Sequence, residues 1–152
     1  MEEVKNSNAP KTLLQRMNEI ELLSPHVDIS FPPEEKTFVL RIQRWSSEES
    51  GNAQGEARRK VNSVGYANPE IRASEMQEVL SIEYYKLAKK HLIGWTSDAM
   101  EYNPANREKF FTALSPVEQV MLGILAAAML IQDEKNAGKK FPPALSTQSE
   151  SV

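Results

Sequence analysis

Two histidines and three pairs of adjacent carboxylates are the residues of this chain whose chemistry suits acid–base catalysis. The histidines are His26 and His91, and the pairs are Glu2-Glu3, Glu34-Glu35 and Glu48-Glu49. A carboxyl group acts as a general acid near neutral pH when burial or a like charge raises its pKa, and we expect these polar segments to be exposed. Neither histidine has triad-like neighbours in the sequence. We therefore predict that the protein is not an enzyme.

Metal and cofactor sites are not indicated either. The chain has no cysteine, which excludes disulfides, thiolate zinc sites and cysteine nucleophiles. No ligand lies at metal-binding spacing around His91, so we expect this side chain to be packed or half-exposed. The P-loop, the dinucleotide-binding glycine fingerprint and the G-x-S-x-G nucleophile motif are missing from the sequence. We accordingly expect no catalytic residue, no metal and no cofactor.

The composition is that of an ordinary soluble globular protein. The chain has 152 residues, with 40% hydrophobic and 26% charged residues and a net charge of −3. This charge gives no electrostatic basis for binding nucleic acid or an anionic membrane. The densest basic cluster, Arg58-Arg59-Lys60, has no stacking aromatic nearby and indicates a solvated surface. The longest apolar run, Val120–Ile131, is shorter than the roughly 20 residues that cross a bilayer.

The ends of the chain differ in composition from its middle. The N-terminus is acidic and polar, unlike a signal peptide, and the C-terminus is rich in Pro, Ser, Thr and Gln. We expect disorder at residues 1–10 and 138–152 and a single mainly helical domain at residues 11–137.

The first predicted helix is short and amphipathic. Thr12 and Gln15 form a capping-box pattern at its start, and Ser24-Pro25 ends it. Its apolar face either packs on the domain or belongs to a detachable arm that grips a partner.

A β-hairpin is predicted next. Apolar and polar residues alternate from Val27 to Phe31 and again from Phe38 to Gln43, which is the period of a strand. The proline-rich segment between them supplies the connecting loop.

The segment after the hairpin is predicted to be irregular. Ser46 and Glu49 form a capping-box pattern, but Gly51 and Gly55 each cost about 1 kcal/mol relative to alanine in a helix. We expect residues 50–65 to be a mobile polar segment with some helix in its second half.

Two long helices complete the predicted fold. Asn68-Pro69 begins a helix that runs to about Leu92, and Ser115-Pro116 begins one over residues 116–136. Between Val120 and Ile131 the second helix is apolar nearly all round. It is either the central core helix, or part of its surface meets another chain.

The expected fold class is therefore mainly α: a small helical domain with a short N-terminal β-hairpin and disordered ends. The residues expected in its core are Phe38, Leu40, Ile42, Val79, Leu80, Leu87, Trp95, Phe111, Val120, Ile124, Leu125 and Met129.

Large aromatic side chains gather between the two long helices. A helix–loop–helix corner is predicted from Leu92 to Leu114, with Asn103 or Asn106 capping a short helix that carries Phe110-Phe111. These rings either fill the core or line a groove for an apolar helix, to which methionines of the last helix add adaptable surface. The candidate partner-binding residues are Trp95, Tyr102, Phe110, Met121, Leu125 and Met129.

This corner resembles the tail assembly chaperone family of tailed bacteriophages, in which a helix ends in a hydrophobic residue followed by Gly-Trp, and an aromatic and polar segment precedes a helix with hydrophobic pairs. Ala105 and Met100-Glu101 depart from the family pattern. The matching residues are Ile93, Gly94, Trp95, Asp98, Tyr102, Asn103, Pro104, Asn106, Phe110 and Phe111.

The resemblance implies a non-enzymatic assembly factor. Such chaperones coat the tape-measure protein, recruit tail-tube subunits and then leave, so the resemblance places the chain in the host cytoplasm and outside the mature virion. A homo-oligomer is compatible with this role. The alternatives are a structural minor virion protein (a head–tail or tail component) and a helical adaptor protein unrelated to phage.

Overall fold

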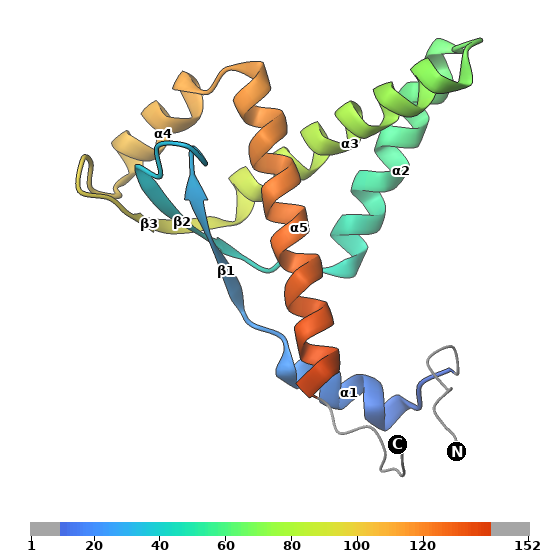
Figure 1. The fold of residues 1–152 in the computed structure, drawn as a ribbon, viewed down its shortest axis with the longest axis horizontal. Helices are drawn as coiled ribbons and strands as arrows, with labels where there is room; N and C mark the ends of the chain where they lie inside the picture. Colours follow the sequence, from blue (N-terminus) through green and yellow to red (C-terminus); the bar gives the residue numbers. More distant parts are fainter. Residues whose placement is uncertain (1–9, 141–152) are drawn as a thin grey trace. The chain divides into compact units, whose positions relative to one another are not determined.

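The computed structural model describes residues 10–140, which contain five helices and a three-stranded antiparallel sheet (Figure 1). The mainly α class with an N-terminal hairpin is thus confirmed. The chain divides into two compact units. One comprises the residues up to Ser24 and those from Ile131 onward, and the other comprises Pro25–Leu130. The disorder expected at residues 1–9 and 141–152 lies outside the described residues.

The first unit contains helix α1, Leu13–Leu22. The predicted capping box is present, because the backbone N–H of Thr12 donates to the Gln15 side chain at 2.8 Å and the N–H of Gln15 donates to the Thr12 hydroxyl at 3.1 Å. After the helix, the backbone N–H and the hydroxyl of Ser24 both donate to the Asp133 carboxylate, at 2.9 and 2.8 Å. These two bonds tie the end of α1 to the C-terminal part of the chain within this unit.

The predicted hairpin forms the first two strands of the sheet. Strands β1, His26–Phe31, and β2, Phe38–Gln43, pair antiparallel with Ile29 opposite Leu40. This register brings together two buried side chains, as the apolar positions of the alternating pattern require.

A third strand was not expected. Helix α3, Pro69–His91, passes without a loop into β3, Leu92–Thr96, which pairs antiparallel with β2. The corner that the sequence indicated therefore begins with a strand. Gly94 lies in the middle of β3 and weakens the local strand signal. The strand forms because it pairs with β2, which is distant in the sequence, so the local pattern of residues did not predict it.

Helix α2, Ser47–Val64, corrects the expectation of a mobile segment at residues 50–65. It runs unbroken through Gly51 and Gly55, and Gly65 ends it in the left-handed conformation, with φ of 72°. One side of the helix is buried, and this burial offsets the low helix propensity of the glycines. The buried residues are Ala53, Ala57 and Val61.

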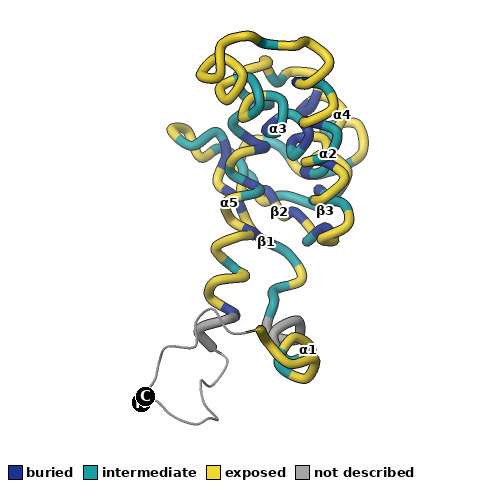
Figure 2. Tube along the Cα trace, turned by 90° about the vertical axis from the view of Figure 1, so that its right-hand side faces the viewer, coloured by how far each residue is buried: buried dark blue, intermediate teal, exposed yellow. Residues whose placement is uncertain are grey.

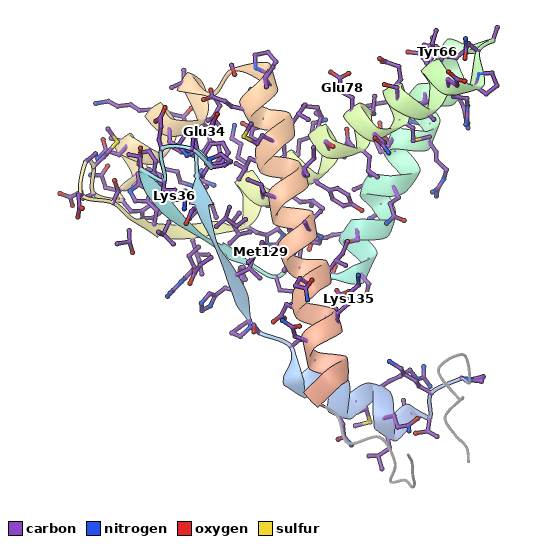
Figure 3. The ribbon with its side chains drawn as sticks, viewed as in Figure 1. Glu34, Lys36, Tyr66, Glu78, Met129 and Lys135 are labelled. Carbon is purple, nitrogen blue, oxygen red and sulfur yellow. The ribbon has the colours of Figure 1, made fainter. Side chains whose placement is uncertain are left out.

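Helices α2 and α3 form an antiparallel hairpin that projects from the sheet (Figure 1). Tyr66, labelled in Figure 3, lies at the tip of this hairpin. As predicted, Asn68 caps α3: its side chain accepts from the N–H of Glu70 at 2.8 Å, and Pro69 takes the first helical position.

The last two helices are α4, Pro104–Ala113, and α5, Pro116–Lys140. Asn103, rather than Asn106, caps α4, since its side chain accepts from the Asn106 N–H at 2.8 Å. The helix predicted over residues 116–136 continues to Lys140, so residues 138–140 are helical and not disordered as expected.

Helix α5 crosses α3 at a steep angle, and the two backbones meet at Gly123 (Figure 1). A Cβ atom at this position would lie 2.0 Å from the backbone oxygen of Ser81 and 2.9 Å from the backbone nitrogen of Tyr85. Leu122 and Ala126 are buried on the same side of α5. Glycine is therefore required at position 123 by contact with a neighbouring helix rather than by its own backbone angles.

The core differs from the expected list mainly in α5. Leu40, Ile42 and Phe111 are buried as predicted, but Ile124 and Met129 are 52% and 41% exposed, because the crossing at Gly123 turns the opposite side of α5 inward. The other expected residues are partly buried, and four of them pack against the core: Phe38, Leu87, Trp95 and Leu125. Buried side chains that the list missed include Val27, Ile29, Phe31, Trp45, Tyr85, Leu92, Leu122 and Leu130.

We predict that Gly123→Ala lowers the free energy of unfolding by about 1–3 kcal/mol, because the added methyl group overlaps the Ser81 carbonyl. Urea denaturation followed by circular dichroism measures the change. Gly51→Ala is the matched control: a Cβ there meets nothing within 4 Å, so the better helix propensity of alanine should raise stability by up to about 1 kcal/mol. Equal stability of the two variants would contradict the close crossing.

Candidate partner-binding surface

Trp95 lies at the centre of a cluster of aromatic rings. Its ring centroid is 5.1 Å from that of Phe38, 4.9 Å from Tyr102 and 5.4 Å from Phe110. The indole N–H donates to the backbone carbonyl of Met100 at 2.8 Å, which holds the loop after β3 against the sheet. Three of the predicted site residues are thus brought together, but Trp95 and Tyr102 pack chiefly against other rings.

The adjacent pair Phe110-Phe111 is buried on both sides of α4. The Phe110 ring contacts Phe31 of the sheet at a centroid distance of 6.1 Å, whereas Phe111 contacts Tyr85 of α3 at 6.2 Å. Two neighbouring helical residues point in different directions, and here each direction meets a different element. Helix α4 therefore joins the sheet to α3.

A pocket of about 330 Å³ opens beside Phe110. Its wall comes from the end of β1, the loop into β2, α4 and the first turn of α5. Most of the lining is apolar, and of the six predicted site residues only Phe110 contributes to it. The lining residues are Phe31, Pro32, Glu35, Thr37, Phe38, Met100, Lys109, Phe110, Ala113, Leu114 and Glu118.

The side of α5 opposite the buried Ala126 is apolar and faces outward. Val117 is 70% exposed and Ile124 is 52% exposed, and Ala128 is also exposed. The stretch Val120–Ile131 contains no charged residue, so α5 itself places no charge on this side between these positions. We call it the outer face of α5, and it consists of Val117, Met121, Ile124 and Ala128, of which Met121 is partly buried.

Of the predicted residues of α5, only Met121 contributes to the outer face. Met121 and Leu125 are partly buried against the core, whereas Met129, labelled in Figure 3, is exposed. The sequence interpretation missed Val117 and Ile124. Their spacing placed them on one side of a helix, but the apolar residues all round α5 concealed which side would face inward.

Helix α5 also has a membrane-like composition. Over Pro116–Ala137 it is long and apolar enough to cross a membrane, although its uncharged run, Val120–Ile131, is shorter than a bilayer requires. The core helix of a soluble protein meets the same criteria of length and composition, and the property alone is weak evidence for a membrane span.

His91 lies at the end of α3 against the start of α2. Its Nε2 atom is 2.9 Å from the Glu49 carboxylate, which also accepts from Lys90 at 2.9 Å and from the backbone N–H of Ser46 at 3.1 Å. The hydrogen bond with His91 and then that from Lys90 lower the pKa of Glu49 to about 2. His91 is half-buried, as predicted, and the group fastens two helices together.

Glu83 is the buried carboxylate of the α2–α3 hairpin. Its oxygen accepts from Lys60 at 2.8 Å and from Lys86 at 3.1 Å. Burial raises the pKa of Glu83, but the hydrogen bonds from the two ammonium groups outweigh it and the pKa is lowered. An ionised and neutralised carboxylate of this kind stabilises the hairpin and is not suited to donating a proton.

We predict that Glu49→Gln lowers the free energy of unfolding at pH 7 by up to about 1 kcal/mol, a value limited by solvent screening of a surface ion pair. Because the pKa of Glu49 is depressed from 4.5 to about 2, the stabilisation is present above pH 4.5 and is lost as the pH falls towards 2. Urea titrations of both proteins at several pH values should converge at the acidic end. Glu48→Gln, one residue earlier in the same helical turn, controls for the helix dipole, and an equal loss in that variant would contradict the assignment.

No model of a known protein family, no curated protein sequence and no solved structure matches the chain.

Proposed function

We propose that the protein is a non-enzymatic tail assembly chaperone of a tailed bacteriophage. In this role it binds apolar helices of the tape-measure protein in the host cytoplasm, keeps them soluble and recruits tail-tube subunits. The resemblance of the segment from Ile93 to Phe111 supports the family. The surface described above supports the kind of partner.

The observation that carries the proposal is the outer face of α5. Exposed apolar side chains at Val117, Ile124 and Ala128 follow one another along the helix, and a partner helix that packs along this row buries them without breaking any internal contact. The pocket begins at the same end of α5, since Glu118 and Leu114 line it. A large apolar side chain of the partner fits such a cavity.

The partner is expected to be a helix rather than an extended strand. The apolar side chains of the outer face follow the rise of α5, so a second helix matches them turn by turn. A tape-measure protein with long apolar helices presents this pattern repeatedly, and several copies of the chaperone are then able to bind along it.

We predict that co-expression makes the tape-measure protein soluble and that Ile124→Asp abolishes this effect, because a buried aspartate in the interface is unpaired. Ile71→Asp is the matched control, since Ile71 is also a 52% exposed isoleucine on a helix but lies on the α2–α3 hairpin. Pull-down and the soluble fraction of the tape-measure protein are the readouts. Leu125→Asp is a poorer test, because Leu125 packs against the core.

Two results would contradict the chaperone role. The tape-measure protein could be soluble at full length without this chain, or the two isoleucine variants could behave alike. Mass spectrometry of purified virions then separates the remaining roles, because a structural minor virion protein stays in the particle and a chaperone does not.

A further inference from the structure

A second apolar helix face is exposed in the same chain. On α1, Leu13 is 64% exposed, Leu14 is 67% exposed and Met17 is 53% exposed, and Figure 2 shows most of the described part of this helix as exposed. A helix of ten residues is not stable by itself in water and normally depends on packing of its apolar side. We therefore expect the exposed apolar side of α1 to pack against another surface.

The outer face of α5 matches α1 in length and in character. Ten residues of α-helix extend about 15 Å, and the row from Val117 to Ala128 extends about 17 Å at the same rise per residue. Leu13, Leu14 and Met17 supply the exposed apolar side chains of α1, and Val117, Ile124 and Ala128 supply those of the outer face. The small side chain of Ala128 allows a second helix to approach α5 closely.

The charges are complementary at one end of the two surfaces. Lys11 and Arg16 lie at the N-terminal end of α1, whereas the acidic residues of this helix, Glu19 and Glu21, lie in its C-terminal half. The pocket at the start of the outer face carries two carboxylates, Glu35 and Glu118, against one ammonium group, Lys109. A leucine of α1 in the pocket brings Arg16 towards these carboxylates, where a charge-assisted hydrogen bond adds specificity.

We propose that the occupant of the outer face, in the protein without a client, is helix α1 of a second copy of this chain. Each copy supplies one α1 and one outer face, so a two-fold symmetric dimer contains the same contact twice. Leu14 and Met17 pack along Val117 and Ile124, and Leu13 lies next to the pocket, on the same side of α1 as Arg16 three residues later. The dimer requires no tape-measure protein, so it can be tested independently of the chaperone role.

Sedimentation velocity of the full chain tests this arrangement. We expect wild type and Ile71→Asp to sediment as twice the 17.1 kDa chain, and Met17→Asp and Ile124→Asp to sediment as single chains. Circular dichroism and urea denaturation establish that each variant is folded, and Leu13→Asp replaces Met17→Asp if the latter is unfolded. A monomeric wild type at all concentrations overturns the proposal.

Mixing the two monomeric variants identifies the surfaces that meet. The Ile124→Asp chain keeps an intact α1 and the Met17→Asp chain keeps an intact outer face, so the mixture should regain one of the two contacts and form a weaker heterodimer. If two outer faces paired with each other instead, Met17→Asp would dimerise alone, which overturns the exchange of α1.

Client binding is read separately in the co-expression assay. A monomeric wild type that still binds the tape-measure protein removes the dimer and leaves the chaperone role intact. A wild type that dimerises but does not bind the tape-measure protein supports the dimer and contradicts the chaperone role.

Discussion

The contact between Gly123 and the backbone of α3 determines how α5 is placed within the residues Pro25–Leu130. A Cβ atom at position 123 would come within 2.0 Å of the Ser81 oxygen, so any rotation of α5 that directs a larger residue at α3 creates a severe overlap. Leu122 and Ala126 are thereby directed inward and buried. The same rotation directs Ile124 to the opposite side, which makes the outer face a consequence of the crossing.

A helix placed in this way usually carries polar residues on its outer side, and α5 does not. Exposed apolar surface forfeits about 25 cal/mol for each Å² that could have been buried. Contiguous apolar patches on a single chain are accordingly typical of binding surfaces. The pocket lies at one end of the outer face, since Glu118 belongs to both its lining and the first turn of α5. Together they present a row of apolar contacts with one deeper anchor point.

The sequence predicted the local features of this fold and missed those that depend on distant residues. The caps at Asn68 and Ser115 were predicted correctly because a cap involves residues a few positions apart. Helix α2 was missed because the cost of Gly51 is local, whereas the burial that offsets it comes from packing. Strand β3 depends on pairing with β2. The pocket was hidden for the same reason, since Phe31 and Phe110 meet only in the folded chain.

If α1 of a second copy and a client helix use the same outer face, they bind in competition. Each client helix that binds must displace one α1. The apparent affinity for the client is therefore the intrinsic affinity multiplied by the fraction of outer faces that are free. A covered face keeps Ile124 and Val117 from associating non-specifically while no client is present, and short apolar helices that bind weakly are excluded. A long client with many apolar turns offsets this cost by engaging several copies at once. A ten-residue α1 suits such a role because its few contacts make it a weak competitor that a longer helix replaces.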